Sequence, residues 1–343
     1  MWHLSAHFLK QKGSLPLKIL FITATRIGDA VLSSGLIAHF AKKYPGARFT
    51  IVCGAPAAPL FESVPGLERL IIINKLPLHT HWLRLWGMLA TTSWDIACDL
   101  RGSAITSLLL TRNRIVGSHR DETVHQVIEL GRLTNIEPWP SPTLWISDAD
   151  RKVAKSLLPY DGAVLAIGPT ANWGGKQWPP DRFAALALQV TAVDGFLPGA
   201  RIAVLGAASE RSMAQPFLRE IPSERLIDLI GQRLSIAAAC IKHANLYVGN
   251  DSGLMHVAAA AGTLTLGLFG PSSEVRYGPW GGHCATVRTP KGFKEIVLAD
   301  GFDHTSHQSL MEDLSIDTVY TALEKLYSEA ENGWEGEPSE RPA

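Results

Sequence analysis

Short apolar segments alternate along most of the chain with longer segments of helical periodicity. Runs such as Lys18–Thr23, Phe49–Cys53 and Ala163–Ile167 are apolar nearly throughout, which is typical of strands buried on both faces. Between such runs, apolar positions recur every three or four residues, as in Asp29–Tyr44, and this spacing predicts helices. Strands of this kind that alternate with helices predict parallel sheets covered on both faces, an α/β fold.

The alternation occurs twice, which predicts two Rossmann-like units. Strands are expected at 18–23, 49–53, 70–73, 95–99, 114–117, 163–167, 201–205, 226–229, 246–249, from 264, and at 286–288. Helices are expected at 29–44, 57–64, 81–91, 103–110, 181–193, from 210, and at 235–243, 254–261 and 316–328. A segment with four prolines, residues 137–160, is expected to be the crossing between the units.

These expectations give five parts to the chain. Residues 1–16 form a leader, 17–158 the first Rossmann-like domain and 159–315 the second. Residues 316–328 form a last helix, and the acidic tail 329–343, rich in glycine and proline, is expected to be disordered. Two such domains that face each other leave a cleft between the loops at the carboxyl ends of their strands, where ligands bind.

Composition and charge narrow the class of partner. The 32 basic and 32 acidic residues cancel, so no nucleic-acid partner is expected. The leader has no continuous apolar block, and no stretch reaches the roughly 20 apolar residues of a membrane span, so the expected location is cytoplasmic. The cysteines are far apart and are expected to be buried thiols of a reducing compartment; they are Cys53, Cys98, Cys240 and Cys284.

Two aromatic stretches are compatible with a surface contact to a membrane. Trp2 and Phe8 stand among lysines, and His81–Met88 places two tryptophans beside an arginine. The alternative is that these rings pack in the core or between helices, and that is the more common situation for aromatic side chains.

The stretch from Val248 to Pro271 is the strongest candidate for a ligand site. It predicts a strand, a sharp turn at Asp251-Ser252-Gly253, a helix of small residues and a second strand. A helix that begins directly after a strand points its free amides at the carboxyl edge of the sheet, where an anion such as a diphosphate is favoured. An ordinary capped helix is the alternative for this tripeptide.

Three further residues are candidates for binding or catalysis. Asp29 follows the first strand and its turn, so its carboxylate is either a general base at the cleft or a helix cap. Lys176 lies in a loop rich in glycine and proline that can bend over a phosphate. Glu210 is placed either to accept from ribose hydroxyls or to interact with a helix dipole.

Several common site types are not expected. Neither unit has a GxGxxG after its first strand, which disfavours a nicotinamide or flavin enzyme, and there is no GxxxxGK[ST]. The pairs His79 and His81, and His304 and His307, lack further ligands and are expected to be histidines of surface loops. We therefore expect neither a metal nor a cofactor.

Taken together, the motifs resemble glycosyltransferase family 9, the ADP-heptose:lipopolysaccharide heptosyltransferases. The resemblance covers about residues 17–328, and the order and spacing of the motifs make it specific. The motifs are Arg26–Asp29, Arg112–Gly117, Lys176–Pro179, Gly249–His256, Leu268–Pro271 and Met311–Ile316.

This resemblance implies a GT-B fold, in which two Rossmann-like domains face each other and a C-terminal helix crosses back to the N-terminal domain. It implies that Asp29 is the general base on the acceptor hydroxyl, and that transfer inverts the anomeric centre in one displacement without a divalent metal. It also implies a set of donor-binding residues around the ribose, diphosphate and sugar, with packing as the alternative for the last of them: Lys176, Glu210, Asp251, Ser252, Gly253 and His256.

The expected function is transfer of heptose from ADP-heptose to a sugar hydroxyl of the lipopolysaccharide inner core. The expected partners are this nucleotide sugar and the core acceptor, with peripheral contact to the cytoplasmic face of the inner membrane as a further option. One alternative is a nucleotide-sugar epimerase or hydrolase of the same fold. Another is a non-catalytic protein that binds nucleotide sugars as a scaffold.

Overall fold

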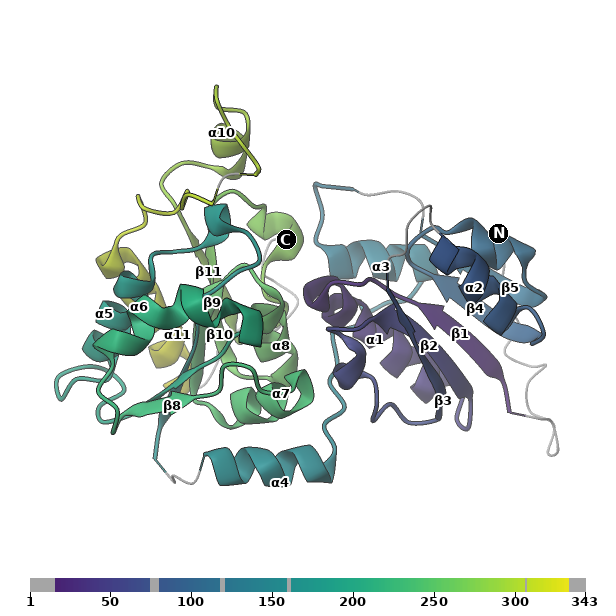
Figure 1. Cartoon of the computed structure of the whole chain (residues 1–343), viewed down its shortest axis with the longest axis horizontal. Helices are drawn as coiled ribbons and strands as arrows, with labels where there is room; N and C mark the ends of the chain where they lie inside the picture. The colour runs from purple at the N-terminus through teal and green to yellow at the C-terminus, as the bar shows by residue number, and fades with distance from the viewer. Residues whose placement is uncertain (1–15, 75–79, 118–120, 159–161, 306, 333–343) are drawn as a thin grey trace.

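The computed structural model describes residues 16–74, 80–117, 121–158, 162–305 and 307–332 as two α/β units that lie side by side (Figure 1). The predicted leader, apart from its last residue, and the tail beyond residue 332 lie outside the described residues. Each unit contains one sheet in which every strand pair is parallel, as the alternation of apolar and helical segments predicts.

The first unit is built on five strands in the order β3-β2-β1-β4-β5. The strands are β1 Lys18–Ile22, β2 Arg48–Gly54, β3 Leu67–Ile73, β4 Trp94–Asp99 and β5 Thr111–Val116. Its helices are α1 Ile27–Lys43, α2 Thr80–Leu89 and α3 Gln126–Thr134. Helix α1 packs against one face of the sheet and α2 against the other, so the central strands are buried on both sides.

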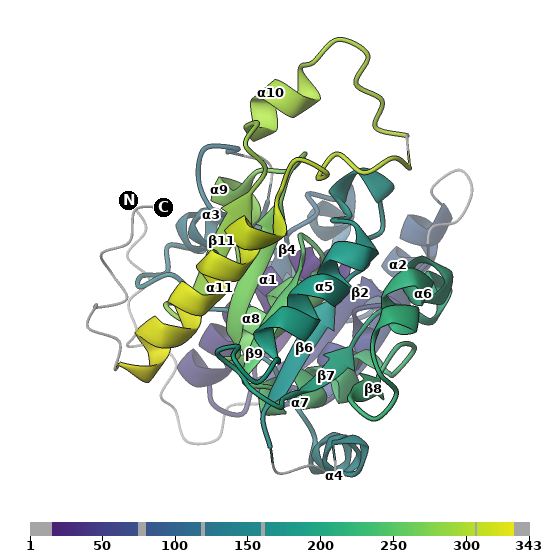
Figure 2. The ribbon, with the colours of Figure 1, turned by 90° about the vertical axis from the view of Figure 1, so that its left-hand side faces the viewer.

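The second unit repeats this design with six strands in the order β11-β10-β9-β6-β7-β8. The strands are β6 Val164–Gly168, β7 Arg201–Val204, β8 Leu226–Asp228, β9 Leu246–Asn250, β10 Leu264–Phe269 and β11 Cys284–Arg288. The helices are α4 Asp148–Leu157, α5 Pro180–Val190, α6 Arg211–Glu220, α7 Leu234–His243, α8 Gly253–Ala261, α9 Glu274–Tyr277, α10 Phe293–Val297 and α11 Ile316–Glu331. Helices α5, α6 and α11 cover one face, and α7 and α8 cover the other (Figure 2).

Two predicted helices are only single turns of 3-10 helix. The segment 57–64 has a turn at Ala58–Leu60, and Pro65 disfavours the helical backbone for the residue before it, Val64. The segment 103–110 has a turn at Ala104–Leu108. There, the amide of Ser103 donates to the Asp99 carboxylate, and β5 begins too soon for further turns.

Two helices were missed in the region taken as the crossing and just before it. Helix α3 ends at Asn135, whose left-handed φ of 52° stops it, and α4 begins at Ser147, whose Oγ accepts the amide of Asp150. Helix α4 packs against α7 of the second unit. The domain boundary at residue 158 therefore stays a proposal, since α4 precedes it and yet contacts the second unit.

The last helix, α11, does not cross back to the first unit as expected. Its apolar residues Val319, Leu323 and Leu326 are buried in the core that lies between the second sheet and α5. Figure 2 shows α11 along the outer face of that sheet. A helix with one apolar stripe needs one surface against which to bury it. For α11, that surface is formed by β10, β11 and α5. The helix continues to Glu331, so the first residues of the predicted disordered tail are helical.

Candidate functional site

A cavity of about 1360 Å³ lies between the two units and is lined by both. The loops that follow the central strands β1 and β4 of the first sheet, and β6 and β9 of the second, all open into it. This is the edge at which parallel sheets bind ligands. Every residue that the sequence singled out as a site residue lines this one cavity: Asp29, Lys176, Glu210, Asp251, Ser252, Gly253 and His256.

The N-termini of α1 and α8 meet across the cavity (Figure 1). A Cβ atom on Gly253 would stand 2.6 Å from Cβ of Ile27, and one on Gly28 would stand 2.8 Å from Cδ2 of His256. Each glycine therefore allows a contact that no larger residue could make without moving a neighbour. The two halves of the site are therefore in direct contact at these two glycines.

Asp29 is the third residue of α1, because the helix begins at Ile27, two residues earlier than predicted. Its side chain is half-buried at the cavity wall. Among the described residues, no group donates a hydrogen bond to its carboxylate, and the helix begins without a side-chain cap. The carboxylate is therefore available to a ligand in the cavity, and the cap that the sequence left as an alternative is not formed.

Lys176 and Asp251 form an ion pair on the opposite wall. The Lys176 ammonium donates to Oδ2 of Asp251 at 2.5 Å, and the aspartate side chain is only 6% exposed. Lys176 ends a short 3-10 turn after β6, and Asp251 follows β9 directly. Pairing gives the buried carboxylate a charge-assisted hydrogen bond and holds the cation at the carboxyl edge of the sheet.

Asn250 fixes the loop that carries Lys176. Its fully buried side chain accepts from the amide of Trp178 at 2.9 Å and donates to the carbonyl of Pro169 at 3.1 Å. These two bonds clamp the start and the end of the loop against β9.

The N-terminus of α8 offers free amides to the cavity. Ser252 has an extended backbone, and its side chain does not cap the helix. Gly253 is the first helical residue and lines the cavity, and the backbone amides of the first turn have no acceptor within the helix. Such a helix start is a ready anion site.

Glu210 lines the same cavity, at the end of a 3-10 turn after β7. Its Oε2 accepts from Thr170 Oγ1 at 2.8 Å and from the amide of Ala207 at 2.9 Å. The second of these bonds caps the turn, so the helix-terminus explanation is correct in part. The residue lines the cavity as well, and a contact to a ribose stays a prediction.

His256 is buried on α8, one turn after Ser252, and is 4% exposed. Burial lowers its pKa to about 4, and the nearby Asp251 carboxylate offsets this only in part. The ring is therefore neutral near pH 7 and packs on Gly28 of the first unit. Packing is thus established for His256, while a ligand contact stays a prediction.

Polar contacts join the two units beside the cavity. Arg276 of α9, itself 2% exposed, donates to Oε2 of Glu129 and to the carbonyl of Asp121, each at 2.7 Å. His125 Nε2 lies 2.9 Å from the carbonyl of Gly278, while its Nδ1 accepts the amide of Val127. Burial lowers the pKa of His125 to about 4, so the ring is neutral and donates through Nε2 near pH 7.

The structure adds cavity residues that the sequence reasoning missed, and five of them are arginines. Arg26 was noticed only as part of a motif, and Arg101 follows β4 at the same sheet edge as Asp29, a position that the strand-end rule would have flagged. The others carry no local sequence signal: Arg132, Arg233 and Arg276.

The histidine expectations need one correction. His81 is buried on α2, where its ring lies 5.1 Å from that of Trp82, so it is not a loop residue. His79 lies outside the described residues, and His304 and His307 are exposed. No cluster of three or more histidine, cysteine or acidic side chains suited to a metal occurs within the described ranges. All four cysteines are buried and unpaired, as predicted for thiols.

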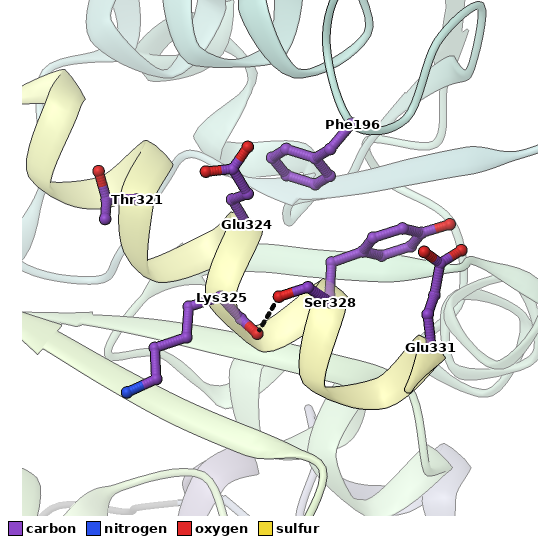
Figure 3. A pocket seen from close by; sticks show the side chains of 7 residues that line it. Phe196, Thr321, Glu324, Lys325, Ser328 and Glu331 are labelled. Carbon is purple, nitrogen blue, oxygen red and sulfur yellow. Dashed lines mark hydrogen bonds between the residues drawn. The ribbon is translucent and has the colours of Figure 1, made fainter. Parts of the chain in front are cut away.

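A second hollow of about 580 Å³ lies on α11 near Phe196 (Figure 3). The Glu324 carboxylate lies close to the Phe196 ring, whereas the Lys325 side chain points away from it. The polar side chains around this hollow on α11 do not point toward a common position. The cavity between the two units is therefore the candidate site. Within the part of the chain that the structure describes, no helix has both the length and the apolar character required to span a membrane.

Comparison with known proteins places this site in context. Residues 101–296 match the model of glycosyltransferase family 9 (heptosyltransferase). Over 91% of its length, the chain is 26% identical to lipopolysaccharide heptosyltransferase 2 of Salmonella typhimurium, of which it covers 99%. A glycosyl transferase family 9 structure from Veillonella parvula matches with a TM-score of 0.74, 20% identity and coverage of 93% of this chain and 100% of that one. The E. coli ADP-heptose lps heptosyltransferase II matches with a TM-score of 0.72, 21% identity, and coverage of 92% and 100%.

Proposed function

Because the chain belongs to glycosyltransferase family 9 and has its two-unit GT-B fold, we propose that it transfers heptose from ADP-heptose to a sugar hydroxyl of the lipopolysaccharide inner core. The observation that carries the proposal is that one cavity contains both the Asp29 carboxylate, which has no partner among the described residues, and the start of α8, which has no side-chain cap. The relatives named as heptosyltransferases support the choice of sugar and acceptor.

Asp29 is proposed as the general base. A sugar hydroxyl is a poor nucleophile until its proton is removed as the new bond forms, and a positioned carboxylate does this for roughly 10²–10⁴ in rate. Asp29 stands on the first unit and is free of protein partners among the described residues. The acceptor is therefore proposed to bind on the first unit, with its hydroxyl against this carboxylate.

The second unit is proposed to hold the donor and to stabilise the departing ADP. When the bond between the anomeric carbon and the diphosphate breaks, negative charge grows on the diphosphate. The amides at Ser252 and Gly253 and the ammonium of Lys176 lie together on this wall. An ammonium has three donors, so Lys176 can keep Asp251 and still bind a phosphate oxygen. These groups supply the positive field that the reaction needs, and the proposed mechanism is therefore independent of a metal.

Inversion of the anomeric centre follows from the same arrangement. The proposed base and the proposed leaving-group site belong to different units and face each other across the cavity. Attack from the first unit, with departure toward the second, is a single displacement from opposite sides of the anomeric carbon. The stereochemistry is tested by determining the anomeric configuration of the product by NMR, and retention would contradict the single displacement.

The test of the base is the pair Asp29→Asn and Asp29→Ala. Both are expected to lower kcat by roughly 10²–10⁴ while the affinity for ADP-heptose, measured by calorimetry, is nearly unchanged. The matched control is Asp148→Asn, since Asp148 also lies in the first turn of a helix but its side chain is 98% exposed and far from the cavity lining. Unchanged turnover in Asp29→Asn would remove Asp29 from the mechanism.

The same assay separates transfer from the alternatives. Transfer requires an acceptor oligosaccharide, whereas an epimerase or hydrolase would consume ADP-heptose without one. A binding scaffold would retain donor affinity with no turnover on any acceptor. Turnover that persists after dialysis against a chelator is expected, and its loss would refute the metal-independent mechanism.

We further propose that the first unit contacts an anionic membrane surface through α2 and the turn after β4. Leu83, Leu108 and Leu110 are 71%, 68% and 69% exposed. The indole of Trp86 donates to the carbonyl of Leu108 at 3.3 Å, which joins the two segments into one apolar surface. The exposed Arg84 stands within it, and basic residues at such a surface are attracted to anionic lipid.

Sedimentation with phosphatidylglycerol vesicles tests this contact. The double variant Leu83→Ser, Leu108→Ser is expected to sediment much less than the wild type, while its turnover of a lipid-free acceptor is retained. Val193→Ser, which removes a 97% exposed apolar side chain from the second unit, is the control and is expected to sediment normally. Equal sedimentation of the wild type and the double variant would refute the surface.

A further inference from the structure

Arg101 stands beside the proposed base at the carboxyl edge of the first sheet. The amide of Leu100 donates to the carbonyl of Ile22 at 2.9 Å, so the end of β4 lies next to the end of β1, which leads to Asp29. Arg101 and Asp29 both line the cavity from the first unit. The side chain of Arg101 is therefore on the wall where the proposed function places the acceptor.

The position of Arg101 is fixed by its surroundings. The carboxylate of Asp99, which is fully buried, accepts the amide of Arg101 at 2.9 Å and the amide of Ser103 at 3.0 Å. The guanidinium carbon lies 5.0 Å from the centre of the Trp82 ring, over its face. Stacking on an aromatic ring leaves the edge of a guanidinium, with its N–H donors, free to bind.

One N–H donor group of the Arg101 guanidinium has no hydrogen-bond acceptor among the described residues. This group is Nη1, which is buried. Three other cations at this cavity form ion pairs, whereas Arg26 is exposed to solvent: Lys176 pairs with Asp251, Arg276 with Glu129, and Arg233 with Glu62. The rest of the half-buried side chain lines the cavity. A buried donor without an acceptor is costly, so a ligand in the cavity that brings an anionic oxygen against this guanidinium is favoured.

We propose that Arg101 binds an acidic group of the acceptor, a carboxylate or a phosphate, and so selects acidic over neutral acceptor sugars. This inference rests on the proposed function. A planar guanidinium matches the two oxygens of a carboxylate or phosphate, which is the geometry of a specific, bidentate contact. The donor's diphosphate is a less suitable partner, because its proposed site is on the other unit, at Lys176 and the start of α8.

The test compares acceptors of different charge in wild type, Arg101→Gln and Arg101→Lys. The three acceptors are a core oligosaccharide, the same molecule with its carboxylates reduced to alcohols, and the same molecule after dephosphorylation. With the acidic acceptor, Arg101→Gln is expected to lower kcat/KM by about 10- to 100-fold through acceptor KM, with donor KM unchanged. With the acceptor that lacks the recognised group, wild type and variant are expected to be nearly equal, which identifies that group as carboxylate or phosphate. Arg101→Lys keeps the positive charge but lacks the planar guanidinium, so its kcat/KM with the acidic acceptor is expected to be only slightly higher than that of Arg101→Gln.

Arg112→Gln is the matched control, because Arg112 belongs to the same sheet but its side chain is 77% exposed and pairs with Asp95 away from the cavity lining. It is expected to behave as the wild type with all three acceptors. Trp82→Leu, which removes the ring under the guanidinium, is expected to reduce the preference for the acidic acceptor part of the way.

Several results would overturn the assignment. An unchanged preference for the acidic acceptor in Arg101→Gln would do so, and so would a rise in donor KM in place of acceptor KM. If the wild type transfers no heptose at all, the proposed function fails. In that case, calorimetric binding of the acidic and reduced oligosaccharides to wild type and Arg101→Gln still tests Arg101, and equal binding in all four combinations refutes its role.

Discussion

Gly253→Ala is expected to slow sugar transfer by about 10²-fold while leaving each unit folded. The added methyl group would stand 2.6 Å from Cβ and 2.8 Å from Cγ2 of Ile27, and 3.3 Å from the amide nitrogen of Gly28. Two carbon atoms in ordinary contact are about 3.5–4.0 Å apart, so the start of α1 must retreat by about 1 Å.

This displacement of the start of α1 is important because it moves Asp29, the proposed general base. Asp29 lies two residues after Ile27 in the first turn of α1, and the displacement would carry it away from the donor side of the cavity. A misplacement of about 1 Å in a reacting group is sufficient to lower a rate by about 10²-fold. The backbone of Gly253 has no positive φ, and alanine favours helix, so neither strain nor propensity accounts for the loss.

The assay is heptose transfer under saturating donor and acceptor, combined with two second-site variants. Ile27→Gly removes both Cβ and Cγ2 and is expected to restore much of the rate of Gly253→Ala. Ile27→Ala leaves the Cβ that makes the shorter contact and is expected to restore little. Thermal unfolding of each variant shows whether the fold is retained.

This design separates the spacing of the units from donor binding, since Gly253 is also a predicted donor residue. If the methyl group acted by displacing a diphosphate oxygen, donor affinity would fall and Ile27→Gly would not restore it. If Gly253→Ala turns over at the wild-type rate, or if both Ile27 variants restore it equally, the contact between α1 and α8 does not set the reacting distance.

Further predictions concern the stability of the second wall. Lys176→Met leaves the Asp251 carboxylate buried without its cation and is expected to lower the free energy of unfolding by about 3 kcal/mol in urea titrations; the double variant with Asp251→Asn should lose less, and equal losses would contradict pairing. Asn250→Ala is expected to cost about 2–3 kcal/mol in the same titration, since two clamping hydrogen bonds are lost; wild-type stability would show that the clamp is dispensable. Burial lowers the pKa of His125 and His256 from 6.5 to about 4, so below pH 6.5 the unfolded chain binds more protons than the folded one. Unfolding free energy should fall by about 1 kcal/mol for each histidine between about pH 7.5 and 5.5, and a flat profile would argue against neutral, buried rings.

The sequence predicted the strands well, and the residues that it singled out line one cavity, because both outcomes depend on local apolar pattern and on one rule of parallel sheets. Strands such as β1 and β9 are apolar at nearly every position, and the loops after them carry Asp29 and Asp251. Since the carboxyl ends of parallel strands lie at one edge, the predicted residues had to gather there. Their presence in a single cavity is the outcome that this rule leads one to expect.

What the sequence did not indicate depends on contacts between distant segments. The apolar stripe of α11 shows that it packs on something, but only the fold shows that the partner is the second sheet and not the first unit. The tryptophans of α2 appeared as one aromatic group. In the structure, Trp82 lies under Arg101, while Trp86 is 38% exposed next to Leu108.

Pairing is also what separates arginines that look alike in the sequence. Arg276 and Arg101 each lie near the end of an element and each reaches the cavity. Arg276 is 2% exposed and binds Glu129 across the two units, so its charge is used to hold the molecule together. Arg101 stacks on a tryptophan and interacts electrostatically with the buried Asp99 carboxylate, but its Nη1 has no hydrogen-bond partner among the described residues, so hydrogen-bonding capacity is left for a ligand. A guanidinium acts structurally or in recognition according to whether the protein itself supplies its hydrogen-bond acceptor, and for Arg101 we propose that the acceptor substrate supplies it.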